Sequence, residues 1–318
     1  MRYKKRICGC CLVLLAFSAY AQKLNKPDLV KLPFAFSQVN RTPMENTPVY
    51  FNARLLLVAN YRPGGVNAKG KDAYLYIDDL VTGEEVARFG TGHTFVSAYV
   101  NGPELHVFAL DFSDFGEIIK SKGITHFVTR DLKEWTEETA IQPSEGESLF
   151  NTSVCKDEEG FLMAYETNKP VQFCFKFARS KDLKTWNKLA GIAFTGEHKE
   201  YSACPMIRYI KPYYYVIYLH AKIKDHNGWI SYIARSKDLV DWDLSPFNPV
   251  LEATESEGKN NSDVDILEYE GKTYLFYGIG DQQTWSTIRV AMYDGSMKEF
   301  YESYFPKSQK FNKVSAKQ

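Results

Sequence analysis

Short apolar runs recur along most of the chain, and clusters of Gly, Asn, Asp and Lys separate them. The runs are rich in Val, Ile, Tyr and Phe; examples are 55–61, 105–112, 161–166, 213–220 and 273–279. These residue types favour extended strands, whereas the clusters between them favour turns. No segment sustains the 3.6-residue apolar period of an amphipathic helix over three turns. The pattern therefore predicts an all-β protein.

A repeated motif orders these runs into five units. The motif Ser/Thr-x-Asp-Leu-x-x-Trp occurs three times, ending at Trp135, Trp186 and Trp242. Fainter copies are Ile77-Asp-Asp-Leu80 and Met292-Tyr-Asp-Gly295, so the motif recurs about every 50 residues. Five units of four antiparallel strands define a five-bladed β-propeller. A two-sheet sandwich is the alternative, but it leaves the fivefold register unexplained.

The repeat also sets the expected boundaries. It places the propeller at 45–306, after an N-terminal lead segment at 22–44 and before a polar C-terminal tail at 307–318. The expected fourth strands of the blades are 85–89, 138–141, 189–194, 249–253 and 299–304. We expect the repeated aspartate to accept hydrogen bonds from backbone N–H groups of the turn between strands three and four. We expect the tryptophan to pack between blades, so both residues have structural roles.

The first 21 residues differ in kind from the rest. The basic cluster Arg2-Tyr-Lys-Lys-Arg6 precedes an apolar run, and Ala19-Tyr20-Ala21 has the small-x-small form of a cleavage site. These features predict a signal peptide at 1–21 and an exported protein, either periplasmic, secreted or held at the cell surface. A membrane anchor is the alternative, although the apolar run is too short to span a bilayer.

Charge and cysteine usage narrow the class of partner. The 318 residues include 39 basic and 39 acidic ones, and four of the basic residues lie within 1–21. The remaining chain is therefore mildly acidic, which predicts no nucleic-acid partner because such proteins need a concentrated basic face. Cys155, Cys174 and Cys204 show neither a disulfide framework nor zinc-ligand spacing, although a single disulfide stays open. We expect a monomer without a membrane span.

Blade geometry indicates where the chemistry lies, because the start of strand one and the end of strand two share a face. Polar residues at the starts of the first strands are Glu45, Asn46, His93, Asn151, Glu200, Asn261 and Asp263. Polar residues at the ends of the second strands are Arg62, Asp111, Glu166, His220 and Asp281. A carboxylate beside apolar strands is costly unless it is hydrogen-bonded or used. We therefore predict a ligand site at this mouth.

The motifs resemble those of known enzymes. The Ser-x-Asp-Leu-x-x-Trp repeat, the Asp157-Glu-Glu-Gly160 hairpin and Gly271-Lys-Thr-Tyr-Leu-Phe-Tyr277 look like five-bladed glycoside hydrolases over about residues 45–300. These are the arabinanase and xylosidase group, family 43, and the invertase-like family 32. The resemblance implies a carbohydrate partner and two carboxyl groups, one protonated to assist departure and one ionised to activate water. No cofactor is required, although a structural calcium ion on the axis would suit an oxygen-rich mouth.

The resemblance departs from the family pattern at the catalytic positions. The three family carboxylates fall on Thr47, Asn151 and Ala203, none of which is acidic. We predict that the chemistry has moved, with Glu200 as the acid and Glu45 or Asp263 as the base.

Other residues are predicted to bind the sugar or orient these groups: His93, Asn151, His220, Asp281, Arg62, Asp111, Glu166 and Arg289. For Arg289, an ordinary interblade ion pair is an equal alternative. No residue is predicted to bind a metal. The alternatives to a glycosidase are a non-catalytic carbohydrate-binding propeller and, less favoured, a protein-interaction propeller.

Overall fold

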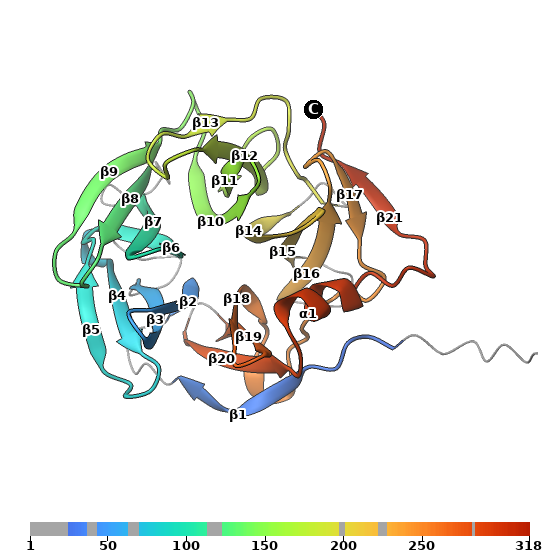
Figure 1. Ribbon diagram of the computed structural model, residues 1–318, viewed down its shortest axis with the longest axis horizontal. Coiled ribbons are helices and arrows are strands. Elements are labelled where there is room, and N and C mark those ends of the chain that lie inside the picture. The colour runs from blue at the N-terminus through green and yellow to red at the C-terminus, as the bar shows by residue number, and fades with distance from the viewer. Residues whose placement is uncertain are drawn as a thin grey trace, which may run out of the picture.

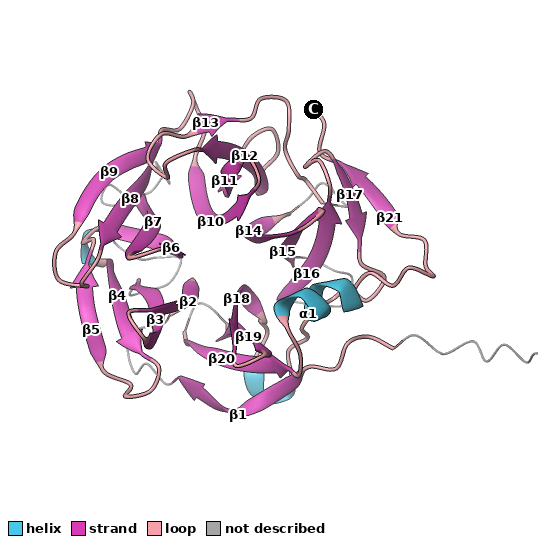
Figure 2. Ribbon diagram, in the orientation of Figure 1, coloured by secondary structure: helices cyan, strands magenta, loops and turns pink. Residues whose placement is uncertain are grey.

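The structure is a computed structural model, and it describes residues 25–36, 43–62, 70–112, 123–196, 201–221, 228–281 and 284–318. The predicted signal peptide at 1–21 and the predicted acid Glu200 lie outside these ranges. Within them, strands dominate and α1 (Met297–Ser303) is a short helix (Figure 2). No helix of the described ranges is long and apolar enough to cross a membrane.

Five antiparallel sheets surround a central axis in the described part of the chain, and each sheet is one blade (Figure 1). Blade one contains β2 (Asn46–Phe51), β3 (Arg54–Tyr61), β4 (Tyr74–Asp79) and β5 (Glu85–Phe89). Blade two contains β6 (His93–Asn101), β7 (Glu104–Asp111), β8 (Ile124–Thr129) and β9 (Thr136–Ile141). Blade three contains β10 (Leu149–Asp157), β11 (Gly160–Thr167), β12 (Cys174–Ser180) and β13 (Asn187–Lys188).

The last two blades each include a strand from an end of the chain. Blade four contains β14 (Ala203–Ile210), β15 (Tyr213–Ala221), β16 (Trp229–Ser236), β17 (Asp241–Leu244) and β21 (Asn312–Ser315). Blade five contains β18 (Ser262–Tyr269), β19 (Lys272–Gly280), β20 (Ser286–Tyr293) and, at its outer edge, β1 (Val30–Phe36). Short 3-10 turns lie at Gly70–Asp72 and Glu255–Glu257. The predicted five-bladed propeller with four antiparallel strands per blade is confirmed.

The expected fourth strands of blades three, four and five are wrong. In blade three the fourth strand is β13, and 189–194 contributes only isolated bridges at Ile192 and Phe194. Segment 299–304 lies in and just after helix α1, because Ser296 and Glu299 form a capping box that starts a helix. The β1 strand takes its place, so the lead segment before the repeat supplies the outer strand of the last blade. In blade four, β17 is the fourth strand, and 249–253 contributes only a bridge between Leu251 and Ser231.

Apolar side chains pack between neighbouring blades. The described residues contain five clusters of buried apolar side chains, and each cluster draws on two adjacent blades. The repeated tryptophans belong to these interfaces: Trp135 stacks on Phe89 of the preceding blade, with ring centroids 3.6 Å apart. Trp242 is fully buried and stacks on Phe177. The predicted packing role of the tryptophan is confirmed.

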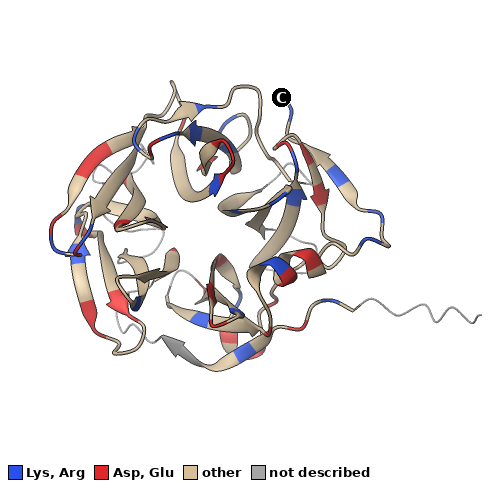
Figure 3. Ribbon diagram, in the orientation of Figure 1, with Lys and Arg blue, Asp and Glu red and all other residues tan. Residues whose placement is uncertain are grey.

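The repeated aspartate has the expected structural role. Asp131 Oδ1 accepts hydrogen bonds from the N–H groups of Lys133 and Glu134, both at 2.9 Å. The same pair of turn bonds recurs at Asp79, Asp182 and Asp238. Charged residues lie mainly on such turns and on outer strands, while most of the inner ribbon is uncharged (Figure 3). The few charges near the axis therefore stand apart.

Candidate active site

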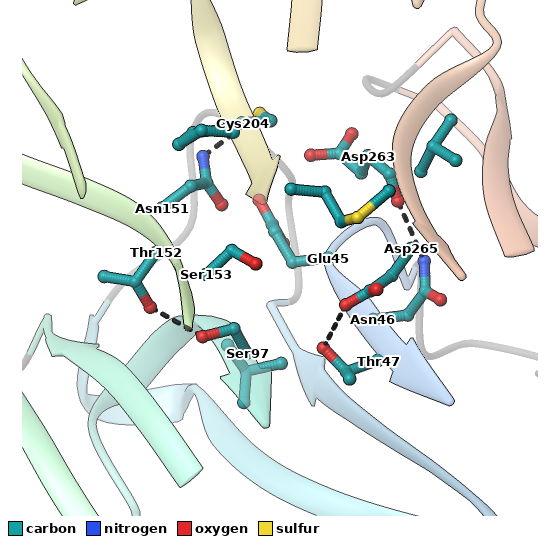
Figure 4. A pocket seen from close by; sticks show the side chains of 14 residues that line it. Glu45, Asn46, Thr47, Ser97, Asn151, Thr152, Ser153, Cys204, Asp263 and Asp265 are labelled. Carbon is teal, nitrogen blue, oxygen red and sulfur yellow. Dashed lines mark hydrogen bonds between the residues drawn. The ribbon is translucent and has the colours of Figure 1, made fainter. Parts of the chain in front are cut away.

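The starts of the inner strands meet in a small pocket on the propeller axis. It encloses about 30 Å³, which holds only water-sized molecules, so a sugar ring would lie above it in the mouth. Its polar lining residues are Glu45, Asn46, Thr47, Ser97, Asn151, Thr152, Ser153, Cys204, Asp263 and Asp265. Figure 4 shows the Glu45 and Asp263 side chains both directed into this space, from blades one and five. We call this end of the channel the acidic mouth.

Local backbone distortions aim side chains into the acidic mouth. The pairing of strands one and two shifts register near the start of β6, β10, β14 and β18, as in a β-bulge. Phe95, Cys204 and Asp263 lie at these shifts with positive φ angles of 55°, 46° and 52°. A bulge redirects a side chain, and non-glycine residues tolerate positive φ only where the surroundings hold them. The same device thus serves three blades.

Glu45 is paired with a buried arginine. Arg62 Nη2 lies 3.1 Å from Glu45 Oε1, and both side chains are almost fully buried. The Arg62 guanidinium also lies over the Phe95 ring, 4.6 Å from its centroid. The second oxygen of Glu45, Oε2, is buried and has no hydrogen-bond partner among the described residues. This oxygen is therefore available to a molecule in the pocket.

Asp263 and Glu166 hold protons more tightly than ordinary carboxyl groups. Burial raises the pKa of Asp263 to about 6, and the nearby Glu45 adds to the rise. Burial likewise raises the pKa of Glu166 to about 7, with contributions from Asp263 and Glu45. Carboxyl groups that share a site cannot all ionise easily, because like charges repel. Asp263, Glu166 and Glu45 therefore form one electrostatically interacting set.

Glu166 lies behind the pocket wall and organises it. Glu166 Oε2 accepts hydrogen bonds from Asn151 Nδ2 at 2.8 Å and from the Cys204 backbone N–H at 2.9 Å. Asn151 Nδ2 also lies 3.1 Å from Cys204 Sγ. These bonds fix the Asn151 side chain and the distorted backbone at Cys204, so Glu166 positions pocket residues from blades three and four.

A hydrogen-bonded floor closes the pocket from below. Thr47 Oγ1 donates to Asp265 Oδ2 at 2.8 Å, and the Arg208 guanidinium forms an ion pair with Oδ1 of Asp265. Burial raises the pKa of Asp265, while Arg208 opposes the rise. On the other side of the floor, the hydroxyl groups of Ser97 and Thr152 form a hydrogen bond of 2.6 Å (Figure 4).

An aromatic wall borders the acidic mouth. Phe95, Phe150, Phe173 and Tyr201 form a continuous series, with successive ring centroids 5.8, 6.0 and 4.8 Å apart. Burial raises the pKa of Tyr201, and Cys204 and Glu166 add to this effect, which places Tyr201 close to the acids. Aromatic rings offer flat apolar surfaces and, in tyrosine, a hydroxyl group. The wall is suited to the apolar face of a sugar.

The structure brings together five of the residues predicted for the site. Glu45, Asn151 and Asp263 line the pocket, and Arg62 and Glu166 contact lining residues. His220 is buried at the end of β15 with its ring edge-on to Tyr232, and it does not line the pocket.

Other predicted residues lie elsewhere. His93 bonds to Thr125 Oγ1 at 2.9 Å within blade two, and Asp111 is its register partner on β7. Asp281 accepts hydrogen bonds from the Thr284 and Trp285 N–H groups and so caps a turn.

Arg289 belongs to a separate ion-pair cluster. Its Nη1 lies 3.1 Å from Oε1 of buried Glu257, which also pairs with Lys31 of β1. Arg289 therefore makes a structural ion pair within blade five and the turn that leads into it, because its position on the third strand keeps it away from the axis. The cluster ties the N-terminal strand to the last blade.

Sequence reasoning missed Asp265, Arg208 and Cys204 as parts of this region. Asp265 comes two residues after Asp263, and alternation along a strand puts i and i+2 on one face. That spacing was a usable signal for Asp265. Arg208 lies mid-strand, and the bulge that turns Cys204 toward the pocket leaves no mark in the sequence.

No cofactor site is evident among the described residues. Across these ranges, no group of three or more His, Cys, Asp or Glu side chains is arranged to hold a metal ion. An axial calcium ion stays an untested prediction. The described cysteines Cys155, Cys174 and Cys204 are all free, so the disulfide left open by the sequence is not formed.

Comparisons with known proteins support the fold. No protein-family profile and no curated protein matches the sequence. Among solved structures, a glycoside hydrolase matches with a TM-score of 0.67 at 15% identity, covering 86% of this chain and 93% of that one. A β-1,2-mannobiose phosphorylase from Listeria innocua matches at 0.62, with 12% identity and coverage of 87% and 99%. The GH43 endo-arabinanase from Bacillus licheniformis matches at 0.59, with 10% identity and coverage of 81% and 96%.

These likenesses define a class. The chain has the five-bladed propeller fold of solved glycoside hydrolases, as the resemblance in its motifs predicted. At 10–15% identity, the similarity to these structures concerns the fold. Any activity depends on the residues of the acidic mouth.

Proposed function

We propose that this protein is an exported glycoside hydrolase that cleaves glycosidic bonds in oligosaccharides or polysaccharide side chains. The observation that carries the proposal is the pair Glu45 and Asp263, which enter one pocket from two blades. Export rests on the signal-peptide pattern at 1–21. The sugar and its linkage depend on contacts that the fold does not fix.

The proposed roles follow from the surroundings of the two carboxyl groups. Asp263, whose pKa is raised to about 6 by burial, is the proton donor to the departing glycosidic oxygen. Glu45, paired with Arg62, is the carboxylate that takes a proton from water as the water attacks the anomeric carbon. Its unbonded Oε2 is the oxygen placed to accept that proton. Asn151, held by Glu166, is placed to bind a sugar hydroxyl.

Glu200 offers a different assignment of the acid. The sequence predicts Glu200 as the proton donor, in which case Asp263 serves as a base or as a group that tunes its neighbours. The two assignments differ in their pH dependence. If Asp263 is the proton donor, it must be protonated, so turnover should fall as pH rises through about 6. A base Asp263 must be ionised, so turnover should fall as pH drops through that value.

Release of reducing sugar from a panel of plant and algal glycans tests the proposal. On an active substrate, Asp263→Asn and Glu45→Gln should each lower kcat by at least about two orders of magnitude. Glu200→Gln should do the same only if Glu200 is the acid. Asp281→Asn is the matched control, because Asp281 is an acidic turn residue that does not line the pocket. Near-normal kcat in both Asp263→Asn and Glu45→Gln would refute the assignment.

A non-catalytic carbohydrate-binding propeller is the second candidate. The observation that favours it is the loss of acids at Thr47, Asn151 and Ala203, where the resembling families carry their catalytic carboxylates. Thr47 and Asn151 now serve as hydrogen-bond donors to Asp265 and Glu166. Under this candidate, the protein binds glycans from the same panel yet releases no reducing sugar at any pH.

A further inference from the structure

A second and larger cavity opens at the opposite end of the propeller axis. It encloses about 400 Å³, against about 30 Å³ for the pocket at the acidic mouth. It is lined by the C-terminal halves of the inner strands and by Met297 at the start of α1. Pockets of 300 Å³ or more are typical of small-molecule sites. We call this end of the channel the tyrosine mouth, because Tyr50, Tyr99 and Tyr209 line it.

The floor of the acidic mouth separates the two cavities. Asp265 lines the acidic pocket and Arg208 lines the far cavity, so their ion pair lies between them. Arg208 Nη1 also donates to the Ile207 carbonyl at 2.9 Å. A ligand in the far cavity therefore meets a wall that is already hydrogen-bonded, and it occupies a site separate from the carboxyl groups of the acidic mouth.

The charged side chains of the far cavity all have partners within the described structure. Arg208 pairs with Asp265, and Glu268 Oε2 accepts a hydrogen bond from the Met297 N–H at 2.7 Å. Lys156 Nζ lies over the Phe161 ring, 5.3 Å from its centroid. The two cations of the lining, Lys156 and Arg208, are offset by Glu268 and by Asp265, so the cavity has no net charge that would favour a charged ligand. The cavity is thus suited to a neutral molecule.

Each tyrosine of the far cavity is held by a neighbouring aromatic ring. Tyr99 lies edge-on to Phe161 with ring centroids 5.8 Å apart. Tyr209 packs on Tyr214 at 4.8 Å and bonds through its hydroxyl group to Glu158.

Tyr50 completes the set at the rim. It packs on Tyr269 with ring centroids 5.9 Å apart, yet its side chain is 50% exposed. Rings held in place lose little freedom on binding. The tyrosines thus offer preformed flat faces, as well as hydroxyl groups at the rim.

We infer that the tyrosine mouth is a second carbohydrate site, which binds a neutral mono- or disaccharide without cleaving it. The tyrosine faces would stack on the apolar face of the sugar, and polar groups at the rim would meet its hydroxyl groups. This site stands whether or not the acidic mouth hydrolyses glycans, because the two cavities share no carboxyl group.

Calorimetric titration of the Asp263→Asn protein tests the inference with the acidic mouth disabled for turnover. The probes are xylobiose and lactose as neutral sugars, galacturonic acid as a charged sugar, and indole as an apolar molecule. We expect at least one neutral disaccharide to bind and galacturonic acid to bind at least tenfold more weakly, which corresponds to about 1.4 kcal/mol. Tyr50→Ala should weaken the disaccharide affinity by a similar factor.

Two further variants keep the outcome decisive if Tyr50→Ala perturbs the fold. Val100→Trp narrows the cavity while keeping the tyrosines, and it should abolish the same binding. Tyr74→Ala is the matched control, because Tyr74 lies in blade one and lines neither cavity. Binding that survives both Tyr50→Ala and Val100→Trp would overturn the inference. So would binding of indole alone, or of no probe.

The test separates this inference from the proposed function. If wild-type protein releases no sugar while Tyr50→Ala still weakens disaccharide binding, only the hydrolase proposal fails. If wild-type protein is an active hydrolase but disaccharide binding is unchanged in Tyr50→Ala and Val100→Trp, only the second site fails.

Discussion

The two ends of the propeller channel are built from the same five inner strands but carry opposite chemistry. At the acidic mouth, strand starts bring Glu45 and Asp263 into a space of about 30 Å³. At the tyrosine mouth, the other halves of these strands surround about 400 Å³ with aromatic and paired charged side chains. Burial raises the pKa values of Asp263 and Glu166 at the first mouth, whereas the charges around the second cavity sum to zero.

The difference teaches how one repeat can support two kinds of site. Register shifts occur near the starts of β6, β10, β14 and β18, and the later parts of these strands pair regularly. Distorted backbone turns side chains such as Asp263 and Cys204 toward the axis. Regular backbone alternates its side chains and gives flat surfaces. Reactive groups therefore gather at the distorted end, and stacking surfaces gather at the regular end.

Removing the Asp265–Arg208 ion pair between the two mouths should lower the free energy of unfolding more than any other change proposed here. Asp265→Asn would leave the Arg208 guanidinium buried without its counter-ion, which lowers the free energy of unfolding by about 3–5 kcal/mol. Urea denaturation monitored by tryptophan fluorescence measures the change. The matched control is Lys298→Met, which removes an exposed pair with Glu302 and should cost less than about 1 kcal/mol. Equal costs for the two variants would show that the Asp265–Arg208 pair stabilises the fold no more than an exposed ion pair does.

Much of the fold was predictable because one sequence motif recurs along the chain. Three full copies of the Asp-Leu-x-x-Trp motif placed the turns, and the structure gives each aspartate the same two N–H donors. The prediction of the fourth strands failed even after full copies, at 189–194 and 249–253, and most clearly after the weakest copy, at 299–304. There the capping box at Ser296 and Glu299 outweighed the strand-like Phe300 and Tyr301. The closing strand β1 carries no copy of the motif, so the repeat could not reveal it.

The site was only partly predictable because position along a strand does not fix direction. Glu45, Asn151 and Asp263 were found, since they start inner strands in the repeat. Asp281 follows a second strand in the same way, yet the turn after β19 uses its carboxyl group as a cap. The structural role of Arg289 could not be predicted, because its partner Glu257 lies in a segment outside the repeat.

Acid sensitivity should come from the outer part of blade two rather than from either mouth. Burial lowers the pKa of His126 to about 3, and His106 adds to the effect. The unfolded chain takes up this proton below about pH 6.5, while the folded protein resists it until about pH 3, so stability falls as pH falls between these values. The loss should be about 3 kcal/mol between pH 7 and pH 4.

Urea denaturation across this pH range measures the loss. His126→Gln should reduce it, because glutamine keeps a polar group at this position without gaining a charge. His93→Gln, a second histidine substitution in blade two, should keep the wild-type decline. An unchanged decline in His126→Gln would instead assign the acid sensitivity to carboxyl groups whose pKa values are lowered in the fold, such as Glu147 and Glu257, which lie away from both mouths.

The smallest effect is expected at the turns of the repeated motif, on the face of the tyrosine mouth. Although burial acts to raise it, the backbone N–H groups of Asp241 and Val240 hold the pKa of Asp238 below its usual value. Asp238→Ala should cost about 1 kcal/mol at pH 7, because two turn N–H groups lose their acceptor. The lowered pKa means that this stabilisation is present above about pH 4 and is lost as pH falls, so the variant and wild type should converge in acid. Asp294→Ala, in the faint copy that lacks tryptophan, is the control and should change stability less. If Asp238→Ala also weakens disaccharide binding, the turns and the tyrosine mouth are coupled, and this face acts as one unit.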